Sequence, residues 1–158
     1  MKAHEFKELA NGLTHMHFQK CEEGKNRTII SRYYYYIFLK IRDEIIFNYD
    51  TNPKTKEGLT SPKAHGLLRK YIREVSKKSL KIHGIQWDEK EKINEIITFL
   101  EQLHKQRKDA DYEVRKTIDT DDVNSALEKV QEIEQRLNIL EGILKALKNS
   151  NLLPKLNA

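Results

Sequence analysis

The stretch that most constrains the fold runs from Asn26 to Tyr49 and contains neither Pro nor Gly. It is too long and too continuous to be a strand, so we predict a helix. Five apolar residues in it recur at the spacing of one helical face: Ile30, Tyr34, Ile37, Ile41 and Ile45. Further apolar residues widen this face over most of the circumference, which is typical of a central helix with several neighbours.

The polar side of this helix is a single row at helical spacing: Arg32, Tyr36, Lys40 and Asp43. The row passes through the consecutive tyrosines at residues 33–36. A buried tyrosine needs a partner for its hydroxyl group, so such rings are common where a core meets a wet cleft. Two interpretations stay open: the tyrosines form the rim of the core, or Arg32 and some of them border a functional cleft.

Apolar periodicity predicts further helices on both sides of this one. The predicted segments are residues 2–18, residues 61–78 after a loop at 50–60, a helix starting at Asp88 and reaching about Val114, and a final helix spanning about 123–147 after a polar break at 117–122. We therefore expect an all-α, up-and-down bundle of about five helices that forms a single domain over residues 1–158. Its core should span about 3–148, and the tail at 149–158 should fray or dock loosely.

The composition fits a helical protein that is not embedded in a membrane. Charged residues make up 34% of the chain and apolar residues 38%, and three prolines and six glycines are too few for a turn-rich β architecture. No stretch approaches the roughly 20 apolar residues of a membrane span, and the N-terminus lacks a secretory signal. Because the one cysteine, Cys21, also favours a reducing compartment, we expect a cytoplasmic protein. The formal net charge of +5 permits contact with nucleic acid without requiring it.

Arg107 is the most informative anomaly, because it continues an apolar row. That row is formed by Ile93, Ile96, Ile97, Leu100 and Leu103, and its extension by threes and fours gives Arg107, Ala110 and Val114. A cation on a core face needs hydrogen-bonded, preferably anionic, partners. Asp111 lies one turn further on and His104 one turn back. His104, Arg107 and Asp111 thus form one polar stripe. It is either an internal ion pair that holds two helices in register or an anion or phosphate site at a cleft.

A shared pocket is the sharpest structural prediction. His65 tops the apolar row of the helix that starts at Ser61-Pro62, and should face the same interior as Arg107. We expect six side chains to converge near the C-terminal half of the fourth helix: Arg32, Tyr36, His65, His104, Arg107 and Tyr112. We expect no metal and no cofactor. His17 and Cys21 are too few for a structural zinc site, and Glu101-x-x-His104 occurs once where a carboxylate-bridged metal bundle needs it twice.

Three stretches together resemble the HEPN superfamily. They are SRYYYYIFLKIRDEII, SPKAHGLLRKYI and LHKQRKDADYEV, which cover much of the chain between Ile30 and Val114. The resemblance implies an all-α bundle, often dimeric, and in many members a metal-independent ribonuclease that acts as a toxin or in phage defence. Many members are encoded beside a small nucleotidyltransferase. The family signature is Arg, four to six residues, then His; here the arginine is Arg107, and residues 112–114 are Tyr, Glu and Val.

Two functions are therefore expected from the sequence. In the first, the chain is a HEPN-like component of a toxin–antitoxin or phage-defence system and a divergent ribonuclease. Arg107 would stabilise phosphate charge, His104 or His65 would move protons and Tyr112 would orient the substrate, while Arg32, Tyr36, His65 and Asp111 would bind substrate or phosphate. In the alternative, the chain is a non-catalytic module that docks a partner nucleotidyltransferase or binds RNA or a nucleotide. The resemblance implies a homodimer in either case.

Overall fold

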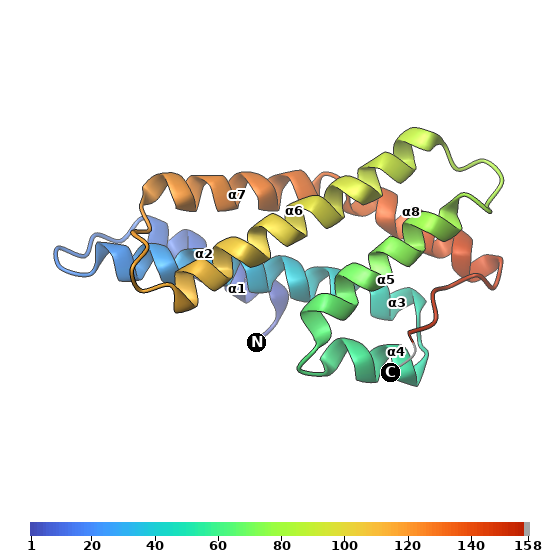
Figure 1. The fold of residues 1–158 in the computed structure, drawn as a ribbon, viewed down its shortest axis with the longest axis horizontal. Coiled ribbons are helices and arrows are strands. Elements are labelled where there is room, and N and C mark those ends of the chain that lie inside the picture. Colours follow the sequence, from blue (N-terminus) through green and yellow to red (C-terminus); the bar gives the residue numbers. More distant parts are fainter. Residues whose placement is uncertain (157–158) are drawn as a thin grey trace. The chain divides into compact units, whose positions relative to one another are not determined.

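The computed structural model describes residues 1–156, and every regular element in this range is a helix (Figure 1). The all-α prediction is thus confirmed. The chain forms two compact units, each made of two separate stretches. Unit 1 comprises Met1–Lys40 and Phe99–Ile133, and unit 2 comprises Ile41–Thr98 and Glu134–Ala158. The single domain expected from the sequence stays a prediction.

Unit 1 contains α1 (Ala3–Thr14), α2 (Glu22–Leu39), the C-terminal part of α6 (Trp87–Tyr112) and most of α7 (Thr120–Glu134). Helices α1 and α2 pack against each other. The core of this unit is aliphatic and aromatic, and it includes Ile30, Tyr33, Tyr34, Ile37, Leu103, Ala126 and Val130.

Unit 2 contains most of the π-helix η1 (Lys40–Ile46), α3 (Phe47–Tyr49), α4 (Pro53–Thr60), α5 (Ala64–Ser79), the N-terminal part of α6 and α8 (Leu137–Asn149). Helix α5 packs against both α4 and α8. The C-terminal tail also docks in this unit: Lys78 Nζ donates to the carbonyl of Leu153 at 3.0 Å, and Leu156 is only 4% exposed. Of the two expected outcomes for the tail, fraying or loose docking, the described residues after α8 show docking, since Leu156 is buried; residues 157–158 lie outside the described range.

The predicted central helix is present, and its apolar face is buried. The helical run starts four residues early, at Glu22, and continues through η1 and α3 to Tyr49. The five residues of the predicted face are each at most 5% exposed. The predicted polar row is wrong at Tyr36, which is only 4% exposed. Lys7 of α1 lies over its ring, 5.0 Å from the ring centre, so a neighbouring helix covers a position that the sequence pattern left to water.

Helix boundaries differ from the sequence prediction where capping residues were misread. The expected loop at 50–60 holds α4, which starts with Asn52 as N-cap and Pro53 as first helical residue; Asn52 Oδ1 accepts from the Lys54 amide at 3.0 Å. Ser61 instead closes a turn, because its amide and its hydroxyl both donate to the Gly58 carbonyl, and α5 starts at Ala64. The first helix ends at Thr14, and Phe18 lies beyond it.

Two further expectations about the C-terminal half are wrong. The predicted final helix is divided into α7 and α8 by a turn at Gln135 and Arg136, a segment without Pro or Gly. Val114 is 88% exposed, because α6 ends at Tyr112 and the apolar row stops at Ala110. Among the described residues, no helix combines the length and the apolar character that crossing a membrane requires.

Candidate functional site

Arg107 lies between two tyrosine rings in unit 1. Its guanidinium carbon is 5.2 Å from the ring centre of Tyr35 and 5.5 Å from that of Tyr112. Its Nη2 also donates to the Tyr35 hydroxyl at 2.9 Å. Tyr112 is the outer ring of this arrangement and is 64% exposed. A cation held over aromatic faces is stabilised by their electron density, and more so as water is excluded.

Asp111 supplies the charge partner that the sequence predicted for Arg107. Nε of Arg107 is 2.6 Å from Oδ2 of Asp111, and the two side chains are 13% and 24% exposed. The Nε–H does not point at this oxygen in hydrogen-bonding geometry, so the contact is an ion pair without an aligned hydrogen bond. Asp43, the acidic residue of the polar row on the central helix, instead pairs with its neighbour Arg42. Arg107 is thus held by rings and by charge together.

Ring contacts connect Arg107 to Arg32. The Phe6 and Tyr35 rings are 5.8 Å apart, and the guanidinium carbon of Arg32 is 5.5 Å from the ring centre of Phe6. Nε of Arg32 is buried and has no hydrogen-bond acceptor in the described part of the chain. Two arginines therefore flank one group of rings, and we call Phe6, Arg32, Tyr35, Arg107 and Tyr112 the aromatic–arginine cluster.

His104 enters the same region through Tyr34. The two rings stack with their centres 5.2 Å apart, and Tyr34 in turn lies edge-on to Tyr35 at 5.7 Å. His104 therefore adjoins the aromatic–arginine cluster through a ring stack.

Of the six residues expected in one pocket, Tyr36 has different neighbours from those predicted. Tyr36 lies between Lys7 and Lys40, whose ammonium groups are 5.0 and 5.7 Å from its ring centre. Tyr35 instead contacts Arg107, so the tyrosine selected from the sequence was the wrong one of the four. His65 belongs to α5 in unit 2, whereas Arg107 belongs to unit 1, so the placement of His65 in the shared pocket stays a prediction. Arg32, His104, Arg107 and Tyr112 remain joined by ring contacts.

Sequence reasoning missed Arg27, which binds the end of α6. It donates to the carbonyls of Ala110, Asp109 and Glu113 at 2.8, 3.2 and 3.1 Å, and also to that of Lys116. The last carbonyls of a helix have no partner within it and carry partial negative charge, which suits an arginine. Arg27 lies within the predicted central helix, but the sequence pattern does not show that its side chain contacts the end of a helix more than 80 residues away. A hollow of about 390 Å³ lies beside it, lined by Arg27, Asp111 and Val114 among others.

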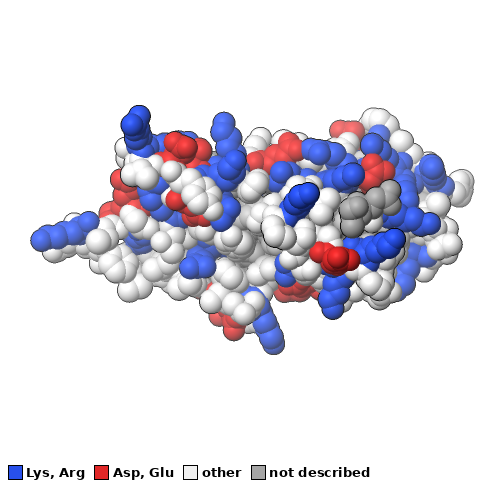
Figure 2. Space-filling model, turned by 60° about the horizontal axis from the view of Figure 1, so that its bottom comes forward, with Lys and Arg blue, Asp and Glu red and all other residues white. Residues whose placement is uncertain are grey.

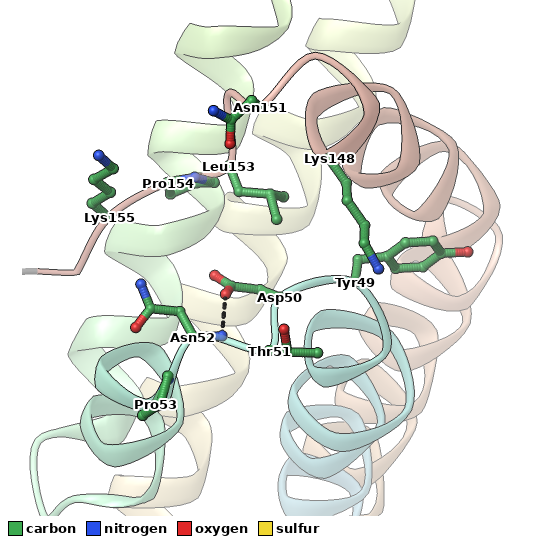
Figure 3. Close-up of a pocket in the computed structure, with 10 residues that line it drawn as sticks. All are labelled: Tyr49, Asp50, Thr51, Asn52, Pro53, Lys148, Asn151, Leu153, Pro154 and Lys155. Carbon is green, nitrogen blue, oxygen red and sulfur yellow. Dashed lines mark hydrogen bonds between the residues drawn. The ribbon is translucent and has the colours of Figure 1, made fainter.

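Unit 2 holds a second feature that the sequence analysis missed, the buried carboxylate of Asp50. It is 4% exposed and accepts hydrogen bonds from the Tyr71 hydroxyl at 2.8 Å, the Thr55 hydroxyl at 3.0 Å and the Asn52 amide at 2.9 Å. Burial raises the pKa of the Tyr71 phenol, and the adjacent Asp50 charge adds to the shift, so this hydroxyl stays protonated and donates. Figure 3 shows the pocket above Asp50, with a volume of about 460 Å³.

The charge of the chain is divided unevenly between the units. Unit 2 carries 16 Lys and Arg against 11 Asp and Glu, whereas unit 1 carries 13 of each kind, so the formal net charge of +5 belongs to unit 2. On the face drawn in Figure 2, blue Lys and Arg side chains are interspersed with red Asp and Glu side chains and with uncharged residues. Among the described residues, no three His, Cys, Asp or Glu side chains gather in a way that could hold a metal ion.

Comparison with known proteins finds a relative in Methanocaldococcus jannaschii, named Uncharacterized protein MJ0992. The two sequences are 37% identical over 141 residues, which cover 87% of this chain and 71% of the relative. No family model matches the chain. No solved structure matches it significantly.

Proposed function

This chain belongs to the same family as Uncharacterized protein MJ0992 of Methanocaldococcus jannaschii, whose name states no activity, and we propose from the site itself that it is a HEPN-like protein that binds single-stranded RNA. The HEPN assignment rests on the three stretches between Ile30 and Val114. The RNA assignment rests on one observation: Arg107 is held under the exposed ring of Tyr112.

An exposed ring backed by an arginine suits a nucleic-acid base. Proteins that bind single strands stack bases on aromatic rings and hold phosphates with nearby cations, and arginine adds cation–π attraction. Tyr112 offers the ring, and its 64% exposure leaves room for a base. Arg32 adds a second cation to the cluster, with its guanidinium carbon 5.5 Å from the ring centre of Phe6.

The geometry favours binding over cleavage. A HEPN-type nuclease needs a histidine four to six residues beyond its arginine, and the three positions where it would stand after Arg107 are Tyr112, Glu113 and Val114. His104 precedes Arg107 and its ring is stacked on Tyr34, while Arg107 is already paired with Asp111. We therefore propose the non-catalytic alternative, with Tyr112 as a base platform, and keep RNA cleavage as an outcome of the test.

The biological setting and the partners are proposals that rest on the resemblance alone. They are a toxin–antitoxin or phage-defence role, a nucleotidyltransferase partner and a homodimer. The rings of Tyr33 and Phe38 on α2 are buried within the chain, so they add no support for the dimer. Light scattering at tens of micromolar protein tests the dimer directly, and a monomer mass would contradict it.

The proposed function is tested by fluorescence anisotropy with a labelled single-stranded RNA. Tyr112→Ala should weaken binding by roughly ten- to a hundredfold, since stacking contributes about 1–3 kcal/mol per base. Arg115→Ala is the matched control, because Arg115 is exposed and close in sequence and carries the same charge as Arg107. The control should change the affinity for RNA by only about twofold, because salt screens a single exposed charge.

The same RNA is then incubated with the protein, with and without EDTA. We expect the RNA to remain intact. EDTA-resistant cleavage that disappears in Arg107→Ala would instead establish the ribonuclease. Equal losses of affinity in Tyr112→Ala and Arg115→Ala would contradict the base platform.

A further inference from the structure

The pocket above Asp50 in unit 2 is independent of the aromatic–arginine cluster. It lies between the connection from α3 to α4 and the chain that follows α8, and its volume is about 460 Å³ (Figure 3). This volume is in the range of sites that hold small molecules, roughly 300–1,000 Å³. Its lining is mixed, with Lys148 and Lys155, the carboxamides of Asn52 and Asn151, and Tyr49.

The floor and one wall of this pocket are fixed by hydrogen bonds. Asp50 is anchored by Tyr71, Thr55 and the Asn52 amide, as described above. The wall formed by the C-terminal tail is tied to α5 by the bond from Lys78 to the Leu153 carbonyl. Tyr49 is fixed as well, because its hydroxyl donates to Glu141 at 2.9 Å. A ligand would therefore meet a largely preformed site, which lowers the entropic cost of binding.

Several polar side chains around the pocket have no partner within the described part of the chain. Neither ammonium group, of Lys148 or of Lys155, makes a hydrogen bond or ion pair there, and the same holds for the side chains of Thr51 and Asn151. Figure 3 shows Lys148 reaching from α8 toward the Tyr49–Asp50 connection, with Lys155 on the opposite side. A smaller hollow of about 180 Å³ shares Asp50 and Thr51 and adds Lys56. Polar side chains without partners therefore surround the fixed Asp50 carboxylate of this pocket.

We propose that this pocket binds a small phosphorylated molecule, of the sugar-phosphate class. Two lysines on opposite sides suit a group with several charged oxygens, and lysine binds phosphate as a point charge. The carboxamides and the Thr51 hydroxyl would bind the hydroxyl groups of the sugar. The carboxylate in the lining, Asp50, already accepts from three donors and sits in the unit that carries the net positive charge.

Ribose 5-phosphate is the probe for a test by NMR on the full chain. Titration should shift amide signals of residues 49–53 and 151–155, while ribose alone and sodium chloride at matched ionic strength should not. Inorganic phosphate should bind more weakly than ribose 5-phosphate, because it lacks the hydroxyl groups. The double variant Lys148→Ala/Lys155→Ala should raise Kd at least about tenfold, as expected for the loss of charge-assisted hydrogen bonds.

Lys145→Ala is the matched control, an exposed lysine of the same helix that is outside the lining. If Lys145→Ala raised Kd for the probe as much as Lys148→Ala does, general charge attraction would explain binding and the site would be overturned. Amide shifts confined to residues outside 49–53 and 151–155 would overturn it as well. A 5′-phosphorylated oligonucleotide that displaces the probe, where its 5′-hydroxyl counterpart does not, would overturn the small-molecule assignment in favour of a nucleic-acid end. Tyr112→Ala should leave probe binding unchanged, and Lys148→Ala should weaken RNA binding no more than Lys145→Ala does, so the two proposals fail separately.

Discussion

Arg27 is the residue whose contacts are most concentrated. It donates to four carbonyls at and after the end of α6, and its side chain is 19% exposed. Its loss leaves these carbonyls without their cation. We expect Arg27→Ala to lower the free energy of unfolding by about 2 kcal/mol, measured by urea denaturation.

Two further variants test whether Arg27 stabilises the fold by its planar fork of donors or by its charge alone. Arg27→Lys keeps the charge but not the planar fork of donors, and should recover only part of the loss. Arg115→Ala removes an exposed arginine and should change stability by less than about 0.5 kcal/mol. Full recovery in Arg27→Lys would show that charge alone matters and that the fork does not.

The pairing of Arg107 with Asp111 can be measured by a double-mutant cycle. The two side chains are 13% and 24% exposed and their hydrogen bond is misaligned, so the ion pair is neither deeply buried nor ideal. We expect a coupling energy of about 1 kcal/mol between Arg107→Ala and Asp111→Asn in urea unfolding. A coupling close to zero would mean that the tyrosine rings alone hold Arg107.

For single residues, the sequence predicted contacts within one helix and missed contacts between helices. Arg107 and Asp111 are four residues apart on α6, and that spacing alone places them together. The ring partner Tyr35 could not be told from Tyr36, since α1 decides which tyrosine is covered, and its packing is not visible in the period of α2. Arg27 was missed for the same reason, because its acceptors lie more than 80 residues away.

At the scale of helices, Arg136 joins the turn between α7 and α8 to α6. Its Nε donates to Glu95, and this hydrogen bond lowers the pKa of the Glu95 carboxyl. A lowered pKa in the folded state stabilises the protein above the ordinary carboxyl pKa of about 4.3, and this stability is lost as the pH falls through the folded-state value. Because Glu95 is 38% exposed, solvent screening limits the effect to a fraction of a kcal/mol.

The Glu95 prediction is measured as stability against pH. Glu95→Gln should cost stability at pH 7 and should match the parent protein more closely as the pH falls through the lowered folded-state pKa of Glu95. Glu91→Gln is the control, since Glu91 is exposed on the same helix. An unchanged difference between Glu95→Gln and the parent at both pH values would mean that the carboxylate charge plays no part.

The same region shows why helix ends were harder to predict than helix existence. Ile133, Leu137 and Leu140 are buried on both sides of the turn at Gln135 and Arg136, and their spacing fits an uninterrupted helix. Apolar periodicity therefore could not reveal the break. Helix α4 starts at a capping pair, Asn52 and Pro53. A second pair of the same kind, Ser61 and Pro62, follows it, and the sequence pattern does not show which of the two begins a helix.

At the scale of the whole chain, the uneven charge is visible only once the fold assigns residues to units. Both units draw on both halves of the sequence, so no segment of the chain looks unusually basic. Unit 1 holds the aromatic–arginine cluster without net charge, whereas unit 2 holds a net charge of +5. We expect stacking in unit 1 and long-range attraction by unit 2 to contribute separately to RNA binding.

This separation predicts different salt dependences for two charge-reversal variants. Lys63→Glu/Lys70→Glu changes exposed residues in unit 2, and Lys20→Glu/Lys105→Glu makes the same charge change in unit 1. For single strands, the slope of log K against log salt is about −0.7 per phosphate neutralised, so the unit 2 variant should flatten the slope by roughly one unit. The unit 1 variant should flatten it less, and Tyr112→Ala should lower affinity at every salt concentration without changing the slope, because stacking releases no counterions. Equal flattening by both charge variants would mean that RNA responds to total charge and not to its place in the fold.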